Sequence, residues 1–169
     1  AFTDQLETDR SFGFNDGRVA LSTRPEQRLG SDEVWDQAEQ ALAEALREAG
    51  MDFHINPGEG AFYGPKIEFQ VLDALKRPWQ LGTLQVDYSM PARFGLTYVQ
   101  PDGGEGTPVM LHRAILGSLE RFIGIFIEHC AGAFPVWLAP VQAVILPITD
   151  RTHDYARKLH ARALELGIR

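Results

Sequence analysis

The feature that most constrains the fold is a run of strand-like segments that follow one another without a helix between them. The segments lie over residues 51–55, 66–72, 79–90, 96–99 and 108–111. In the second of them, apolar Ile67, Phe69 and Val71 alternate with polar side chains, as in a strand with one buried face. Strands joined by short turns pair antiparallel, because parallel neighbours need a long crossover connection. The pattern therefore predicts an α+β fold with a mostly antiparallel sheet and helices on it.

Two helices are expected to pack on this sheet. The first spans residues 31–50, where apolar residues recur every three or four positions between a Ser31 N-cap and a Gly50 stop. The second spans residues 114–130, where apolar side chains occur nearly all round the helix. A helix with that pattern is normally buried. We therefore expect the second helix to lie in the core.

The pattern changes after residues 135–140, which contain two prolines. A continuous apolar strand is expected over residues 141–148 and a helix from residue 149 or 150 to Leu166. One strand and one helix cannot bury both of their apolar faces without a further strand. The sequence thus predicts one domain over residues 1–135 and the first βα unit of a second, truncated domain over residues 136–169.

Composition excludes some classes of protein. The 169 residues contain one cysteine, Cys130, so no internal disulfide or Cys-x-x-Cys metal site can form, and a reducing, cytoplasmic location is expected. No run of about 18 apolar residues is available to span a membrane. The formal net charge of −7 argues weakly against a nucleic-acid partner. That excess is confined to residues 30–60, so the rest of the chain is near neutral.

A glycine-rich loop over residues 58–66 carries the first candidate site residues, Tyr63 and Lys66. Lys66 begins the polar face of the strand that follows, where it could help to line a cleft for an anionic ligand. The alternative is a surface loop with a solvated lysine. Gln80 and Gln85 place polar groups on the long strand over residues 79–90, but a regular strand would point their side chains to opposite faces of the sheet. They can face one pocket only if the strand bends or bulges near Gly82; otherwise the sheet simply has one wet face.

His112 lies where the last strand gives way to the apolar helix, and Arg121 lies within that helix. A single histidine in apolar surroundings is more often a hydrogen-bonded core residue than a ligand, because zinc needs three or four donors. A buried Arg121 would have to meet a carboxylate, a phosphate or the surface, since an unpaired buried charge costs about 3–5 kcal/mol. The histidines and basic residues near the C-terminus are expected to form a solvated helix face.

Three long motifs resemble a known family. They are GEGAFYGPKIEF over residues 58–69, WQLGTLQVDYSMP over residues 79–91 and VMLHRAILGSLERF over residues 109–122. The chain is similar to the threonyl-tRNA synthetase family of class II synthetases, and residues 21–35 and 137–141 fit in the same register. The resemblance implies the C-terminal part of the catalytic core followed by the start of an α/β anticodon-binding domain.

The resemblance also implies a function. Members of this family activate threonine with ATP and Mg²⁺ as threonyl-adenylate, transfer it to tRNA(Thr), work as homodimers and hold a Zn²⁺ ion that binds threonine. Carried onto this chain, the family's functional residues assign Arg121 and Lys66 to catalysis, Arg121 and Gln80 to ATP, Tyr63, Lys66 and Gln85 to substrate, and His112 to zinc.

The chain also departs from the family pattern. The family's other two zinc ligands, its motif 1 and its motif 2 with the catalytic arginine have no counterpart in these 169 residues. We therefore expect a fragment of a threonine-specific ligase that is inactive alone. The competing hypothesis is a non-catalytic, synthetase-like module that binds RNA or a protein partner.

Overall fold

The computed structural model describes residues 2–169, which form two compact units, Ala1–Glu128 and His129–Arg169. The helices that begin in the first unit are α1 (Phe2–Ser11), α2 (Asp32–Glu48), α3 (Met90–Arg93) and α4 (Leu119–Cys130). Its strands are β1 (Arg18–Ser22), β2 (His54–Asn56), β3 (Lys66–Leu72), β4 (Pro78–Asp87), β5 (Tyr98–Val99), β6 (Glu105–Gly106) and β7 (Met110–Ala114).

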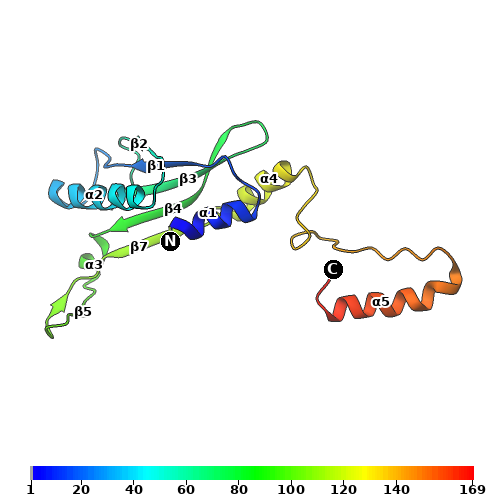
Figure 1. Cartoon of the computed structure of the whole chain (residues 1–169). Helices are drawn as coiled ribbons and strands as arrows, with labels where there is room; N and C mark the ends of the chain where they lie inside the picture. Colours follow the sequence, from blue (N-terminus) through cyan, green and yellow to red (C-terminus); the bar gives the residue numbers. More distant parts are fainter. Residues whose placement is uncertain (1) are drawn as a thin grey trace. The chain divides into compact units, whose positions relative to one another are not determined.

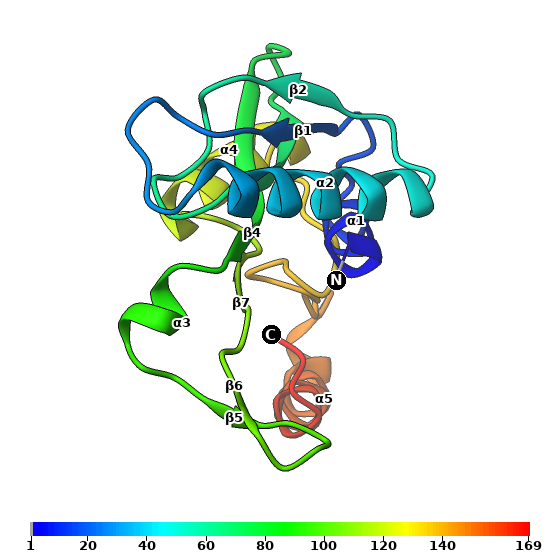
Figure 2. The ribbon, with the colours of Figure 1, turned by 90° about the vertical axis from the view of Figure 1, so that its left-hand side faces the viewer.

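Five strands form the main sheet, in the order β2-β1-β3-β4-β7 (Figure 1). The β1–β3, β3–β4 and β4–β7 pairs are antiparallel, and only β1 and β2 run parallel. The prediction of an α+β fold with a mostly antiparallel sheet is therefore confirmed. A separate two-stranded ribbon, β5–β6, lies beyond the ends of β4 and β7 together with α3 (Figure 2).

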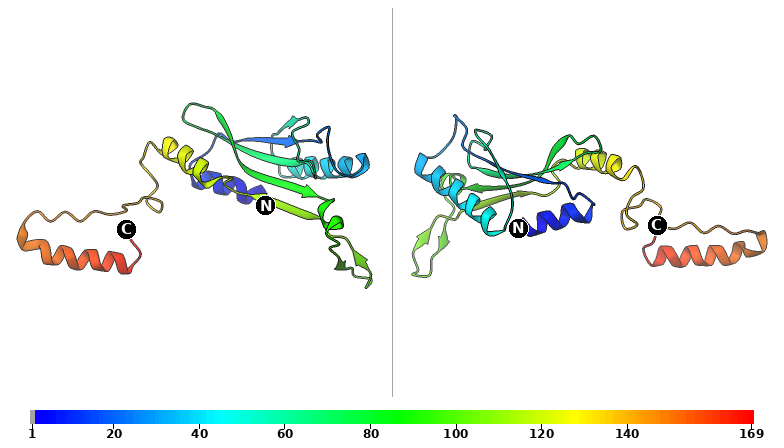
Figure 3. Two further views of the ribbon diagram at one scale, coloured as in Figure 1. Left: turned by 180° about the vertical axis from the view of Figure 1, so that it is seen from behind. Right: turned by 45° about the horizontal axis from the view of Figure 1, so that its top comes forward.

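Helices α1 and α2 lie on the same side of the sheet (Figures 1 and 3). Leu42 and Leu46 of α2 pack in one cluster with the inward residues of β1, β3 and β4. Their apolar spacing is what the sequence predicted, and burying one such side chain contributes roughly 1.5–3 kcal/mol. This layer forms the core and leaves the opposite face of the sheet to polar side chains.

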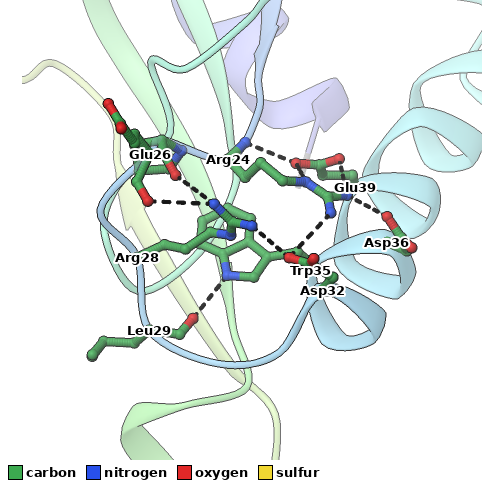
Figure 4. Close-up of polar contacts among 9 residues, drawn as sticks. Arg24, Glu26, Arg28, Leu29, Asp32, Trp35, Asp36 and Glu39 are labelled. Carbon is green, nitrogen blue, oxygen red and sulfur yellow. Dashed lines mark hydrogen bonds and ion pairs between the residues drawn. The ribbon is translucent and has the colours of Figure 1, made fainter.

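Two arginines tie the loop before α2 to the acidic face of that helix (Figure 4). The Arg24 side chain donates to both Glu39 oxygens, at 3.1 and 2.7 Å, and to Asp36. Arg28 forms an ion pair with Asp32. The hydrogen bonds to Glu39 and Asp36 raise the pKa of Arg24 above its ordinary value. Part of the acidic excess over residues 30–60 is thus neutralised within the fold.

A β-bulge interrupts the β3–β4 ladder near Gly82, as the sequence allowed. Phe69 pairs with Gly82 while Gln70 pairs with Gln80, so Leu81 is the extra residue on β4. A Cβ on Gly82 would lie 2.6 Å from the Gln5 side chain, which is itself buried. The glycine therefore leaves the space on the strand that the Gln5 side chain of α1 occupies.

Several expected boundaries were wrong. β4 ends at Asp87 rather than residue 90, because the Asp87 carboxylate accepts the Ser89 and Met90 amides and starts α3, in which Pro91 lies at the N-terminal end. β2 starts at His54 rather than residue 51, β5 at Tyr98 rather than residue 96, and β7 covers residues 110–114 rather than 108–111. Ser31 occupies the N-cap of α2, but its hydroxyl makes no capping hydrogen bond.

The prediction that the apolar helix is buried all round was wrong. It begins at Leu119, and only Phe122, Ile125 and Phe126 are buried. Phe122 and Phe126 pack on Phe12, with ring centroids 4.8 and 5.4 Å away. The adjoining stripe is exposed, because only one side of the helix meets other elements of the described chain; it contains Leu119, Ile123 and Ile127.

Helix α1 and strand β1 were not predicted. Few apolar residues mark α1, and β1 is only five residues long. Nevertheless β1 lies between β2 and β3, where Leu21 is buried against the core. Its position depends on pairing with β3, which is distant in sequence, and local periodicity cannot report such a contact.

The second unit contains a 3₁₀ turn, Asp150–Thr152, and α5, His153–Glu165. The strand predicted over residues 141–148 is absent, because the described residues of this unit provide no second strand with which it could pair. The Gln142 and Ala143 amides instead donate to the Arg169 carbonyl at 2.6 and 3.2 Å. Across residues 2–169, no helix has the length and apolar character needed to cross a membrane.

Candidate functional site

The face of the sheet opposite α2 carries a row of polar side chains. The antiparallel register pairs Lys66 with Gln85, Glu68 with Thr83 and Gln70 with Gln80. Cross-strand partners in an antiparallel sheet share a face, so these six residues face the same side. On the next strand, His112 pairs with Gln85 and extends the row.

The bulge at Leu81 allows Gln80 and Gln85 to face the same side of the sheet. In a regular strand the two side chains would point to opposite faces, because side chains alternate with a period of two. The extra residue shifts the phase by one, and both glutamines join the polar face. Gln80 Nε2 donates to Thr83 Oγ1 at 2.8 Å, which connects the two sides of the bulge. The bend anticipated near Gly82 is thus present.

Tyr63 extends from the glycine-rich loop to this polar face. Its hydroxyl donates to Gln85 Oε1 at 2.8 Å, and its ring centroid lies 5.3 Å from that of His112. The loop is close-packed at Gly64, where a Cβ would lie 2.0 Å from the Val86 carbonyl oxygen. Tyr63 is therefore positioned by a backbone approach that only glycine permits.

Lys66 is paired within the site. Its Nζ lies 2.7 Å from Glu68 Oε1, and the two side chains are 20% and 7% exposed. Because an opposite charge already faces the ammonium, the pair has no net charge. The structure thus places Lys66 on the predicted face, with a carboxylate beside it that sequence reasoning had not assigned to it.

His112 contacts a buried carboxylate. Its Nε2 lies 3.0 Å from Asp87 Oδ2, and the two side chains are 37% and 0% exposed. The other Asp87 oxygen accepts the Ser89 and Met90 amides, at 2.9 Å each. The histidine is therefore held by one ring nitrogen while part of the ring faces solvent.

Arg121 is exposed on the first turn of α4, so the surface is the one of its three expected environments that is observed. Its guanidinium carbon lies 5.7 Å from the centroid of the Trp79 ring, and that of Arg77 lies 5.8 Å from it. Both distances are in the range of cation–π contacts. These three residues line a cavity of about 210 Å³ together with Asp73 and part of α4.

Asp73 fixes the residues beneath Arg121. Its side chain accepts hydrogen bonds from the Leu75 and Arg77 amides, from Arg77 Nε and from Trp79 Nε1. Burial opposes ionisation, but the hydrogen bonds from Trp79, Arg77 and Leu75 lower the pKa of Asp73 to about 2. This carboxylate is therefore ionised at neutral pH and holds the β3–β4 turn together.

The structure brings together four of the six residues predicted for the site: Tyr63, Lys66, Gln85 and His112. Gln80 lies on the same face beyond the bulge. Arg121 lies beside Trp79, which pairs with Val71 and so faces the other side of the sheet from Gln80. Sequence reasoning gave no role to Asp73 or Asp87. Asp73 follows a predicted strand and precedes a turn, where aspartate commonly accepts backbone amides, and that signal could have identified it. Asp87 lies inside the strand predicted over residues 79–90, so the same signal was not available for it.

No group of three or more His, Cys, Asp or Glu side chains that could hold a metal ion occurs among residues 2–169. His112 is consequently a single donor within the described chain. One ligand does not make a zinc site, which requires three or four.

The family described as tRNA synthetase class II core domain (G, H, P, S and T) matches residues 10–130. Threonine-tRNA ligase of Alkalilimnicola ehrlichii is 65% identical over 158 residues, which cover 94% of this chain and 25% of that protein. The corresponding ligase of Teredinibacter turnerae is 59% identical over 169 residues, covering 99% of this chain and 26% of that protein.

Solved structures are similar as well. The RNA binding domain of threonyl-tRNA synthetase from Cryptosporidium parvum superposes with a TM-score of 0.94 at 42% identity, covering 99% of this chain and 42% of that one. A putative threonyl-tRNA synthetase from Aeropyrum pernix gives a TM-score of 0.79 at 35% identity, with 99% and 41% coverage.

The chain spans about a quarter of the length of the curated relatives that it matches. The matches do not assign it to the C-terminal part of the catalytic core, so that part of the prediction is not confirmed. The residues that match the family model do include the polar face, Tyr63, His112 and Arg121. The chain therefore belongs to the class II tRNA synthetase core domain family.

Proposed function

We propose that the protein to which this chain belongs is a threonine-tRNA ligase, which activates threonine with ATP as its Mg²⁺ complex and transfers it to tRNA(Thr). The observation that carries the proposal is the clustering of Tyr63, Gln85 and His112 on one polar face. It is supported by 58–65% identity to threonine-tRNA ligases across the chain.

In this proposal the polar face has an amino-acid end and a nucleotide end. Tyr63, Lys66, Gln85 and His112 surround threonine, with the Tyr63–Gln85 hydrogen bond holding both side chains in place. Gln80 and Arg121 contact ATP. The Arg121 guanidinium is supported by the Trp79 ring and can stack on adenine or face phosphate oxygens. Catalysis is then mainly positional and electrostatic, because the groups orient the reactants and balance developing charge.

We propose His112 as the residue of this chain that binds zinc. The histidine fits the chemistry of a metal ligand, since a carboxylate occupies one ring nitrogen and the described contacts leave the other one unengaged. The remaining ligands would have to come from parts of the protein beyond this chain. When bound, zinc would supply an open coordination position for the threonine hydroxyl, which valine lacks.

The roles of His112 and Arg121 can be tested in the full-length protein. His112→Ala should abolish threonine-dependent ATP–pyrophosphate exchange and bound zinc. Arg121→Ala should raise the KM for ATP or stop turnover. His160→Ala and Arg151→Ala, exposed residues near the C-terminus, serve as matched controls and should leave exchange unchanged. Normal exchange by the His112→Ala protein would refute the assignment of this face to threonine.

We extend the proposal to the domains and the assembly. Residues 1–135 form part of the catalytic domain, and residues 136–169 begin an anticodon-binding domain. The division of the chain into two compact units, which falls after Glu128, supports two domains but not the position of their boundary. The full-length protein is proposed to act as a homodimer in the cytoplasm. Sedimentation of the full-length protein should give twice the mass of one chain.

A second candidate is a module that binds RNA without activating threonine. It is favoured by the description of a similar structure as an RNA binding domain and by the lack of three metal ligands among the described residues. The isolated 169-residue chain should show no threonine activation. Binding of tRNA by this chain, combined with inactivity of the full-length protein, would favour the module over the ligase.

A further inference from the structure

Asp87 is the most enclosed carboxylate on the polar face. It has no exposed surface, although it is the last residue of β4. Three contacts surround it: the Ser89 and Met90 amides at Oδ1, and His112 Nε2 at Oδ2. The oxygens of an aspartate carboxylate accept hydrogen bonds and carry no hydrogen of their own to donate.

This arrangement determines which His112 nitrogen carries the proton. An acceptor-only carboxylate 3.0 Å from Nε2 requires a hydrogen on that nitrogen. In the neutral imidazole the other nitrogen, Nδ1, then has a free lone pair. The described contacts give Nδ1 no hydrogen-bond partner, and the ring remains 37% exposed.

We infer that Asp87 is a positioning residue that holds His112 as the Nε2–H tautomer, so that Nδ1 offers its lone pair to a divalent metal ion on the polar face. This inference rests on the proposed function, because it names the nitrogen through which His112 would serve as a zinc ligand. Histidines that bind metals commonly donate their other N–H to a carboxylate, and loss of that partner costs about 10–100-fold in metal affinity.

The other groups near the ring do not provide an alternative explanation. Tyr63 approaches His112 through its ring, with centroids 5.3 Å apart, while its hydroxyl is engaged by Gln85. Gln85 is the cross-strand neighbour of His112, and its Oε1 accepts from Tyr63. Asp87 is thus the group that fixes the tautomer within the described site.

The tautomer can be measured without activity or metal. Long-range ¹H–¹⁵N NMR spectra of the full 169-residue chain, labelled at histidine and recorded at about pH 8, distinguish the two neutral tautomers. A His112→Gln sample identifies the signal among the five histidines. The inference predicts the Nε2–H form for His112. The Nδ1–H form in the wild-type chain would overturn it, and no variant has to fold for this result.

A variant tests the role of Asp87. In Asp87→Asn the amide oxygen can still accept the Ser89 and Met90 amides, which turns the NH₂ group toward His112 Nε2. The proton should then move to Nδ1. Asp16→Asn, at an exposed ion pair with Lys76, is the matched control and should leave the tautomer unchanged. Retention of the Nε2–H form in Asp87→Asn would contradict the inference.

Zinc content and kinetics of the full-length protein complete the test. Asp87→Asn should lower zinc affinity about 10–100-fold and raise the KM for threonine, while the KM for ATP stays near the wild-type value. An equal rise in both constants would indicate general damage and count against a positioning role. If His112→Ala leaves threonine activation intact, the proposed function fails. The tautomer measurement is independent of that result, because it requires neither activity nor metal.

Discussion

Three buried aspartates show how single residues respond to their surroundings. Asp73 and Asp87 are both surrounded by hydrogen-bond donors, and both organise a turn at the end of a strand. Asp9 on α1 is 7% exposed and receives a side-chain hydrogen bond from Gln5 at 3.1 Å. Burial raises the pKa of Asp9 to about 6, and the Gln5 hydrogen bond only partly opposes it. The ionised Asp9 carboxylate therefore destabilises the folded state at neutral pH.

Asp9 should make stability depend on pH. The pKa of Asp9 is higher in the folded state than the value of 3.8 expected when unfolded. The stability that Asp9 contributes to the folded state is therefore fully present below about pH 4 and is lost as the pH rises through about 6. Asp9→Asn should therefore raise the free energy of unfolding at pH 7, by on the order of 3 kcal/mol at most, and change it little near pH 4. Urea denaturation at both pH values measures this. An equal effect at both would contradict the account.

At the scale of elements, the sequence predicts features that depend on local residue patterns, but not features that depend on contacts between distant parts of the chain. Alternation predicted β3 over its observed residues, and Gly82 indicated the bulge that brings Gln80 and Gln85 to one face. The ladder that places β1 between β2 and β3 could not be derived from the chain locally. Nor could the exposure of one side of α4, since that depends on which elements pack against it.

The glycine loop gives a direct test at this scale. In Gly64→Ala the new Cβ would clash with the Val86 carbonyl at 2.0 Å, so the loop must move away from β4. We expect a loss of about 1–3 kcal/mol in stability, as for overpacked sites, and loss of the Tyr63–Gln85 hydrogen bond. Gly124→Ala on α4 meets nothing within 4 Å and should be neutral or slightly stabilising. Thermal unfolding compares the two, and equal melting temperatures would refute the prediction.

At the scale of the molecule, the long motifs predicted the class II family, which the comparisons establish. The site was predictable as a set of residue types at fixed spacings, because polar residues on neighbouring strands share a face once the register is known. The partners that hold those residues were not, because the hydrogen bonds of Asp87 to His112 and of Asp73 to Trp79 depend on exact side-chain placement.

The central claim is that the polar face of this chain serves threonine activation. The most direct measurement is ATP–pyrophosphate exchange by the full-length protein with threonine and with valine as the amino acid. We predict exchange that depends on threonine and is at least about 100-fold slower with valine, because a site that bonds the hydroxyl rejects the analogue lacking it. Exchange that does not require threonine, or that proceeds equally with valine, would contradict the account.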